Sequence, residues 1–156
     1  MAITPYLLYR DVGAALEFLG KAFGFKKTAD IYRDAEGTIT HASLQLGKDY
    51  AMLGCPGKDY RNPKSLSAVT VMLYVDVADA DQHCAHAKAV GANVVEEPAD
   101  TFYGARRYGV EDPEGHRWYF AAEIKQTGEA TQPAKKKPAK KKKAKRKTDK
   151  KARRRK

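Results

Sequence analysis

The four histidines are the residues of this chain best able to exchange a proton near neutral pH, and their surroundings differ. His41, Ser43 and Gln45 alternate with small or apolar residues in the stretch 38–46, so they share one face of a predicted strand. No Ser, Cys or carboxylate is placed by a recognisable spacing to act as a partner of His41. His41 is therefore a possible base, no residue is assigned as catalytic, and simple solvent exposure also explains the polar row.

His83 and His86 lie one turn apart on a predicted helix, a spacing that can hold a metal ion. Ala80, Cys84 and Ala87 form the apolar face of that helix, which leaves His86 towards solvent. Packing of the apolar face on a sheet, with Cys84 as a small core residue, is favoured over a metal site.

Two turns of related sequence, 34–37 and 112–115, both have the pattern Asp-x-Glu-Gly and begin 78 residues apart. Proline fixes φ and glycine accepts a positive φ, which suits a reversal followed by β-prone residues. If the two turns are equivalent, His41 corresponds to Tyr119. Strand alternation then places three residues on the face opposite Tyr119, two of them core aromatics: His116, Trp118 and Phe120.

The elements that must position these residues repeat in order. The first half is predicted to contain a strand at 3–10, a helix from Asp11 to 23, and strands at 26–33, 38–46 and 50–53. The second half is predicted to contain a strand at 69–77, a helix at 79–90, and strands at 93–97, 106–111 and 116–124. A duplicated βαβββ unit of class α+β follows. The recurrence of Leu8-Tyr9-x-Asp11-Val12 as Leu73-Tyr74-x-Asp76-Val77 supports the duplication, with the register of 69–77 left open.

Basic residues are concentrated at the C-terminal end. Residues 131–156 contain sixteen Lys and Arg and one acidic residue, whereas 1–130 contain fourteen basic and eighteen acidic residues. Ordering a chain costs about 1–2 kcal/mol per residue, which a segment this poor in apolar residues cannot offset. We therefore predict a disordered Lys/Arg-rich tail at 126–156. Its part 133–156 is expected to associate with nucleic acid through phosphate charge, and a solubilising tail is the alternative.

The rest of the composition narrows the setting of the protein. The two cysteines, Cys55 and Cys84, form no Cys-x-x-Cys and indicate neither a disulfide framework nor a zinc ribbon. No leader and no apolar run of ~18 residues is present, so no membrane partner is expected. We predict a cytoplasmic protein, nucleoid-associated if the tail binds DNA.

Several motifs occur in a characteristic order: Tyr9-Arg10-Asp11-Val12 followed by Phe23-Gly24-Phe25, then Gly37-Thr38-x-x-His41-Ala42, Tyr103-Gly104-x-Arg106, and Asp112-Pro113-Glu114-Gly115-His116-Arg117-Trp118. Over residues 1–125 this order resembles the vicinal oxygen chelate (VOC) superfamily, the glyoxalase / bleomycin resistance / extradiol dioxygenase group, and most of all its bleomycin-resistance-like branch. The resemblance implies a glyoxalase/bleomycin-resistance-like domain at 1–125. It would contain module one at 1–54, a linker at 55–67 and module two at 68–125. Their mixed sheets would curl around a cleft that is usually completed in a homodimer.

The resemblance also implies positions for a divalent metal. In this chain they fall on Thr4, His41, a residue between Val69 and Met72 for which Met72 is taken, and Tyr119. Only His41 is an ordinary ligand, and metal sites typically need three or four protein donors. No cofactor is therefore expected, and metal-dependent glyoxalase, isomerase or dioxygenase chemistry is disfavoured.

The same resemblance turns a set of residues towards the cleft. The predicted ligand-binding residues are Tyr6, His41, Ser43, Gln45, Met72, Tyr74, Arg106, Arg117 and Tyr119. Arg106 is chosen over Arg107 because it completes the Tyr-Gly-x-Arg pattern. Aromatic walls with a few oriented polar groups are typical of a small-molecule site.

Three functions remain open. The first is a metal-free, dimeric binding protein for an antibiotic or toxin-like small molecule, whose tail associates with nucleic acid. The second is a lyase or isomerase of the same superfamily using His41, with or without a divalent metal. The third is a nucleoid-associated protein in which the domain only dimerises.

Overall fold

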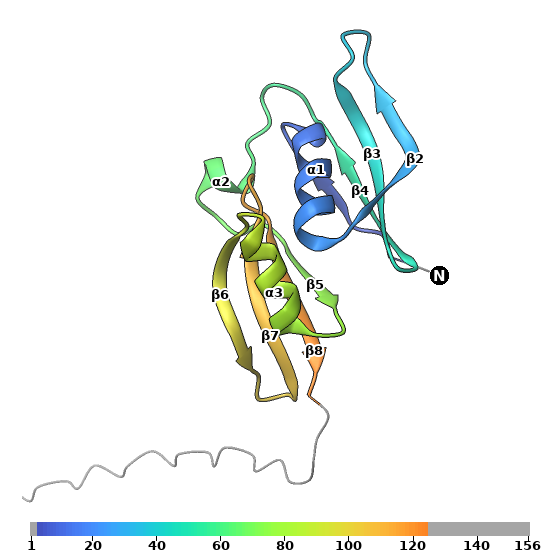
Figure 1. Ribbon diagram of the computed structural model, residues 1–156. Helices are drawn as coiled ribbons and strands as arrows, with labels where there is room; N and C mark the ends of the chain where they lie inside the picture. The colour runs from blue at the N-terminus through green and yellow to red at the C-terminus, as the bar shows by residue number, and fades with distance from the viewer. Residues whose placement is uncertain (1–2, 125–156) are drawn as a thin grey trace, which may run out of the picture.

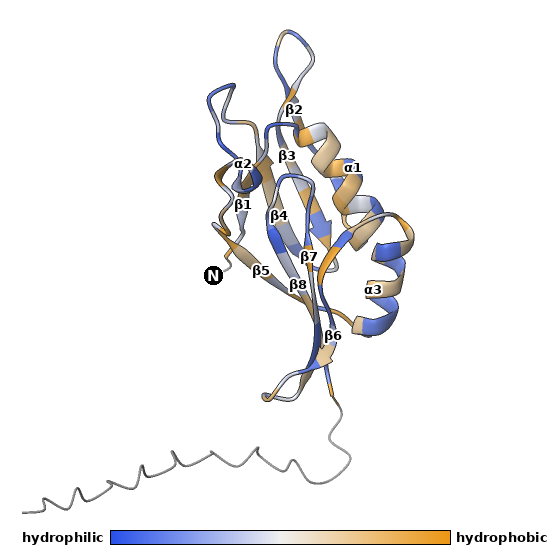
Figure 2. Cartoon of the chain, turned by 90° about the vertical axis from the view of Figure 1, so that its left-hand side faces the viewer, coloured by the Kyte–Doolittle hydropathy of each residue, from blue (hydrophilic) through white to orange (hydrophobic). Residues whose placement is uncertain are grey.

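The computed structural model describes residues 3–124, which form two four-stranded sheets with both long helices on the same side (Figure 1, Figure 2). The α+β class and the two βαβββ units are confirmed. The tail predicted at 126–156 lies outside the described residues.

The two units have the same topology. Sheet A and its helix comprise β1 (Tyr6–Leu8), α1 (Val12–Phe23), β2 (Lys26–Arg33), β3 (Ile39–Leu46) and β4 (Asp49–Gly54). Sheet B and its helix comprise β5 (Met72–Asp76), α3 (Ala80–Ala89), β6 (Asn93–Asp100), β7 (Ala105–Glu111) and β8 (Arg117–Glu123). The strand orders are β1-β4-β3-β2 and β5-β8-β7-β6, and in each sheet the first strand pairs in parallel with the last.

Local features differ from the expectation, beginning with the first strand of each unit, since β1 and β5 are shorter than the strands predicted at 3–10 and 69–77. The linker contains a four-residue helix, α2 (Pro63–Leu66), which has proline in its first turn and is capped by Asn62. Strand β6 continues through Pro98 instead of stopping before it. The missing N–H is tolerated because β6 is an edge strand whose register with β7 shifts at this point.

The helix caps fix how the two units correspond. The Asp11 side chain accepts a hydrogen bond from Ala14 N at 2.9 Å, and the Asp79 side chain accepts one from Gln82 N at 2.9 Å. Asp79 is therefore the counterpart of Asp11. The register of 69–77, which the sequence left open, is thereby settled: Asp76, which the sequence similarity aligns with Asp11, still belongs to strand β5, and the cap lies three residues later.

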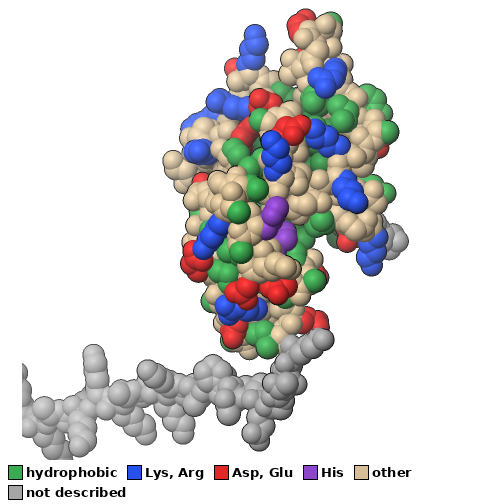
Figure 3. Space-filling model, in the orientation of Figure 1, with side chains coloured by type: hydrophobic (Ala, Val, Ile, Leu, Met, Phe, Trp, Pro, Cys, Tyr) green, Lys and Arg blue, Asp and Glu red, His purple; other side chains and the backbone are tan. Residues whose placement is uncertain are grey.

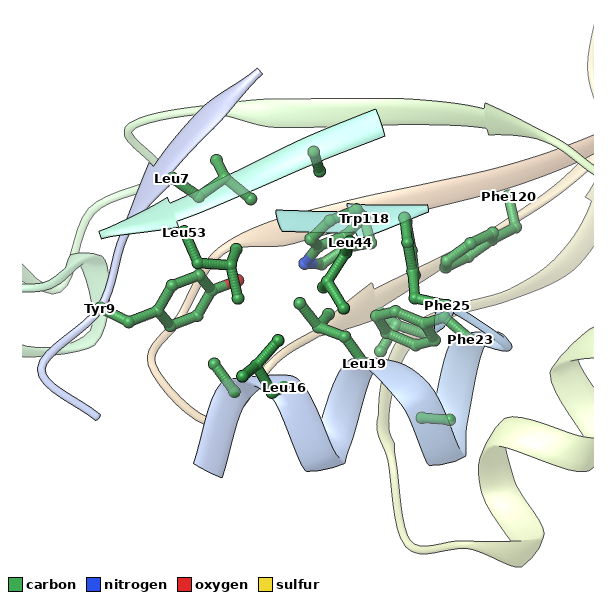
Figure 4. Packing of buried hydrophobic residues seen from close by; sticks show 14 of the residues in the cluster. Leu7, Tyr9, Leu16, Leu19, Phe23, Phe25, Leu44, Leu53, Trp118 and Phe120 are labelled. Atoms are coloured by element: carbon green, nitrogen blue, oxygen red, sulfur yellow. The ribbon is translucent and has the colours of Figure 1, made fainter. Parts of the chain in front are cut away.

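One core joins the two units (Figure 4). The apolar face of α1 covers sheet A, and its last turn contacts sheet B through aromatic rings. The Phe23 ring centroid lies 5.5 Å from that of Trp118 and 4.7 Å from that of Phe120, and Phe25 lies 5.6 Å from Trp118. Burying one such side chain contributes about 1.5–3 kcal/mol. The placement of Trp118 and Phe120 in the core is confirmed.

A buried carboxylate in the β7–β8 turn holds the two units together. Asp112 is 2% exposed and accepts hydrogen bonds from Tyr9 Oη at 2.7 Å and Trp118 Nε1 at 3.2 Å. His116 Nδ1 lies 3.1 Å from the same carboxylate oxygen. Burial alone would raise the pKa of Asp112, but the hydrogen bonds and charge of His116, together with the bond from Tyr9, hold it below its ordinary value.

The next acidic residue of this turn binds the chain just before α1. The Glu114 side chain accepts hydrogen bonds from the backbone N–H groups of Arg10 and Asp11, at 2.9 and 3.0 Å. Asn62 Nδ2 donates to it at 2.8 Å, so the linker is attached to the same point. The most conspicuous sequence motif of the chain is therefore a structural clasp between the units.

On the face seen in Figure 3, no region is occupied by side chains of one charge sign alone. Basic and acidic side chains are interspersed on the face seen in Figure 3. Among residues 3–124 no helix has the length and apolar character needed to cross a membrane.

Candidate functional site

Each sheet has one face towards the helices and one that points outward (Figure 2). Core residues such as Ala42, Leu44 and Leu53 alternate with outward ones along the strands. The outward residues of sheet A, here called the sheet-A face, are Tyr6, Tyr32, His41, Ser43, Gln45, Tyr50 and Met52. Those of sheet B, here called the sheet-B face, are Met72, Tyr74, Asp76, Glu96, Arg107, Gly109, Glu111, Arg117, Tyr119, Ala121 and Glu123.

His41 has a hydroxyl partner on the sheet-A face. Tyr6 Oη lies 3.0 Å from His41 Nδ1, and the two rings are stacked with centroids 5.5 Å apart. Tyr32 of the neighbouring strand β2 pairs with His41, and the two ring centroids are 5.6 Å apart. Gly54 makes this possible, because a Cβ there would come within 2.5 Å of Tyr6 Oη. Sequence spacing could not reveal the pair, since Tyr6 and His41 are 35 residues apart.

The other two polar residues of β3 are less available. Ser43 is only 6% exposed although it lies on the outward side. Gln45 Nε2 donates to Gly47 O at 3.0 Å, so its amide turns back onto the β3–β4 hairpin. Of the predicted polar row, His41 is the residue whose side chain contacts a tyrosine hydroxyl.

The sheet-B face contains a closed group of three side chains. Tyr119 Oη donates to Glu96 Oε1 at 2.7 Å, and Arg107 Nη2 donates to Glu96 Oε2 at 2.7 Å. The guanidinium carbon of Arg107 lies 4.4 Å from the centroid of the Tyr119 ring, in a cation–π arrangement. The ring rests over Gly109, where a Cβ would approach it to 2.9 Å. The hydrogen bond to Glu96 raises the pKa of Tyr119, so the phenol stays protonated at neutral pH.

The prediction that Arg106 lies in the cleft is wrong. Arg106 forms ion pairs with Asp81 of α3 and with Asp100, so its side chain lies on the helix side of sheet B. Arg107 is the arginine of β7 that points outward, beside the Glu96 carboxylate. A four-residue pattern cannot fix the phase of a strand. Tyr108 is fully buried, so alternation counted from it places Arg107 on the outward face. The sequence alone does not show that Tyr108 is buried.

The remaining predicted residues of sheet B lie together. Met72 pairs with Arg117 and Tyr74 with Tyr119, so all four side chains share the outward face. Met72 is 66% and Tyr74 52% exposed. Arg117 Nη2 forms an ion pair with Glu111 Oε2 at 2.9 Å, while its buried Nε has no partner among residues 3–124.

The register corrects the predicted equivalence of His41 and Tyr119. The turn 34–37 joins β2 to β3, whereas the turn 112–115 joins β7 to β8, so the two turns are not counterparts. The helix caps make Tyr74 the counterpart of Tyr6. Tyr74 pairs with Tyr119 and Tyr6 pairs with Met52, so the residue that corresponds to Tyr119 is Met52.

The positions implied for a metal therefore become Thr4, Met52, Met72 and Tyr119. This set offers two thioethers, one alcohol and one protonated phenol, which are poor donors for hard or borderline divalent ions. Within residues 3–124 no cluster of three or more His, Cys, Asp or Glu has metal-binding geometry. The residues present do not fit the metal of the superfamily's enzymes.

The predicted ligand-binding residues form two separate groups in one chain. Tyr6 and His41 meet on sheet A, and Tyr74 and Tyr119 meet on sheet B, but no hydrogen bond or ring contact between described residues links the two faces. A hollow of about 480 Å³ touches an end of each face, at Tyr50 and Tyr74.

The helical histidines lie away from both outward faces. His83 Nδ1 is 2.6 Å from Tyr108 Oη, and its ring packs 4.4 Å from that of Phe120. His86 is exposed, and its Nε2 lies 2.8 Å from Lys21 O. Burial lowers the pKa of His83. Because each imidazole already uses a ring nitrogen within the protein, the packing interpretation of α3 fits better than a metal site.

Comparison with known proteins gives a consistent family. Residues 3–120 match the model of the Glyoxalase/Bleomycin resistance protein/Dioxygenase superfamily. The uncharacterized protein Mb0911c of Mycobacterium bovis is 30% identical over 131 residues, which cover 80% of this chain and 85% of that protein. The uncharacterized protein Rv0887c of Mycobacterium tuberculosis is also 30% identical over 131 residues, covering 80% of this chain and 76% of that protein.

Solved structures show the same fold. TioX from Micromonospora sp. ML1 is 31% identical with a TM-score of 0.63, covering 80% of this chain and 99% of TioX. The fosfomycin resistance protein FosX from Mesorhizobium loti is 12% identical with a TM-score of 0.56, covering 80% of this chain and 92% of FosX. The second likeness concerns the fold alone.

Proposed function

This chain belongs to the Glyoxalase/Bleomycin resistance protein/Dioxygenase superfamily, and we propose that it is a metal-free binding protein for an antibiotic or toxin-like small molecule. The observation that carries the proposal is the pair of outward faces. They expose large apolar and aromatic side chains on both sheets, among them Tyr6, Tyr32, Tyr50, Met72 and Tyr74. Such surfaces on a folded domain indicate a ligand or a partner.

We further propose that the cleft is closed by a second copy of the chain. Within residues 3–124 of one chain, the hydrogen bonds and ring contacts of the sheet-A face and of the sheet-B face stay within each face, so neither face alone surrounds a ligand. In a two-fold dimer the sheet-A face of one copy can oppose the sheet-B face of the other, which gives two identical clefts. His41 and Tyr119 would then come from different copies.

Ligand binding can be tested with purified protein and a panel of aromatic antibiotics, by tyrosine fluorescence and by calorimetry. Binding should be saturable, should survive chelator treatment without loss of affinity, and should leave the ligand chemically unchanged. Tyr74→Ala should weaken it, because that ring is 52% exposed on the sheet-B face. Stoichiometric metal in the purified protein, or a ligand converted to product, would contradict the proposal.

The shared cleft has a sharper test in mixed dimers. His41→Ala damages the sheet-A face and Tyr119→Ala damages the sheet-B face, so each homodimer loses both clefts. A mixed dimer of the two variants has one doubly damaged cleft and one intact cleft. Co-refolding the two variants should therefore restore part of the binding, whereas a cleft built within one chain would stay damaged in every species.

One contact favours a second function, a lyase or isomerase that uses His41. Tyr6 Oη at 3.0 Å from His41 Nδ1 can fix which ring nitrogen carries the proton, as a positioning group does for a general base. Under this alternative, Tyr6→Phe would change the pH profile of turnover while leaving ligand affinity nearly the same. Absence of any turnover across the superfamily's substrate classes would leave binding as the function.

The nucleic-acid association of the tail stays part of the proposal on sequence grounds. Residues 133–156 contain sixteen Lys and Arg, and binding through such a run depends on counterion release. The tail would keep the binding domain near DNA, which is useful if the ligand is a molecule that damages DNA.

A further inference from the structure

The sheet-B face places a guanidinium next to Tyr119, at a position where no metal fits. We propose that Arg107 receives an acidic group of the ligand, and that the ligand is a flat aromatic acid. This rests on the proposed function, because it names the ligand class of the same cleft.

Arg107 is held rigidly yet keeps donors to spare. Both oxygens of Glu96 are already bonded, one to Tyr119 and one to Arg107 Nη2. Among residues 3–124 the Nε and Nη1 groups of Arg107 have no hydrogen-bond partner, and they are not among the buried atoms of the protein. The planar fork of a guanidinium binds a carboxylate through two parallel hydrogen bonds, and an arginine already fixed in place loses little entropy in doing so.

Both carboxylates beside the arginines are already neutralised. Glu96 is hydrogen-bonded to Arg107, and Glu111 forms an ion pair with Arg117 at 2.9 Å. Arg117 lies two residues before Tyr119 on the same side, and its Nε has no partner among the described residues. The unpaired donors beside Tyr119 therefore belong to arginines, whereas the carboxylates next to them are already paired. This arrangement favours binding of an anionic ligand group over an ammonium group. Two further carboxylates of this side, Asp76 and Glu123, lie beyond Tyr74 and Tyr119, at the other ends of β5 and β8.

The surface next to Arg107 suits a ring. Tyr74 and Tyr119 are paired on neighbouring strands, which are about 4.8 Å apart. A fused aromatic ring can therefore contact both tyrosines at once in offset or edge-to-face geometry. Met72 extends the same apolar surface by one position along β5.

The test compares two probes of the same shape, 2-naphthoate and its neutral amide 2-naphthamide, by calorimetry on the full-length protein. The wild type should bind the carboxylate roughly tenfold or more tightly than the amide, as expected for one charge-assisted contact. Arg107→Met keeps the aliphatic stem and should abolish this preference. Arg106→Met is the matched control, because that neighbouring arginine pairs with Asp81 and Asp100 on the opposite side and should leave the preference intact.

The outcomes separate the two levels of the proposal. If both probes bind equally well to the wild type, or if Arg107→Met leaves the preference intact, the role of Arg107 is refuted while cleft binding stands. If neither probe binds, and no neutral aromatic compound binds either, both the ligand class and the proposed cleft are refuted. Thermal unfolding of each variant checks that it is folded. Tyr119→Phe, which removes only the bond to Glu96, should reduce the preference partly.

Discussion

At the scale of single residues, Asp112 is a buried carboxylate whose contacts give it a structural role. It is almost completely buried, and its hydrogen bonds come from both units of the fold. Asp112→Asn keeps the shape but removes the charge that His116 and Tyr9 face. We expect a loss of about 2–4 kcal/mol in the free energy of unfolding, measured by urea denaturation at pH 7. Asp100→Asn, on an exposed ion pair, should change it by less than about 1 kcal/mol.

The same carboxylate predicts a dependence of stability on pH. Its pKa is held below the ordinary value in the folded state, so its contribution is complete above the unfolded pKa of about 3.9 and is lost as pH falls through the lower folded value. Wild type should therefore lose stability more steeply below about pH 4 than Asp112→Asn does. Parallel curves for the two proteins in that range would contradict this role of Asp112.

Residue identities could be predicted from the sequence only where a strand's phase was clear. The phase of 38–46 is unambiguous, and Tyr6, His41 and Gln45 do share the outward face. Arg106 and Arg107 are adjacent charged residues, so no hydrophobic contrast tells which one points outward. The Tyr6–His41 contact depends on pairing of β1 with β4 and of β4 with β3, which is a tertiary fact that local pattern does not contain.

At the scale of elements, the two Asp-x-Glu-Gly turns look alike in sequence but have different surroundings. Gly37 has a φ of 86° and open space around it. Gly115 has a φ of 95°, and a Cβ there would lie 2.5 Å from Lys64 N. Gly37→Ala should cost about 1 kcal/mol for the backbone conformation alone, whereas Gly115→Ala should cost clearly more because the turn must also separate from α2. The midpoints of urea denaturation of the two variants measure the difference. Equal midpoints would show that α2 can move away from the turn without loss of stability.

Element order was predictable because helical and strand periodicities alternate cleanly, and each helix begins at a capping aspartate. Which strand of one unit corresponds to which strand of the other could not be predicted. The repeated turn motif pointed to β3 as the counterpart of β8, although β4 holds that position in the sheet. Short motifs recur by chance or for local reasons, whereas strand pairing is set by the whole sheet. The implied metal positions moved with this correction, and the single ordinary ligand, His41, dropped out.

At the scale of the whole molecule, the charge distribution divides the chain into an acidic domain and a basic tail, to which the two proposed activities are assigned separately. Removing residues 131–156 changes the net charge from +11 to −4, because that segment contains sixteen basic residues and one acidic residue. The described domain retains both outward faces. We therefore expect the truncated protein to keep its affinity for a small-molecule ligand and to lose retention on DNA–cellulose.

Salt and sequence order distinguish electrostatic association from a specific contact. For the full chain, the logarithm of the DNA-binding constant should fall linearly with the logarithm of salt concentration, and the slope should become much shallower without the tail. A chain whose last 26 residues are shuffled keeps the same composition, so it should bind DNA as the natural one does. If shuffling abolishes binding, a specific partner of the tail is indicated. If truncation leaves both DNA retention and protection from a DNA-damaging ligand unchanged, the tail has no tethering role, and the domain alone accounts for the function.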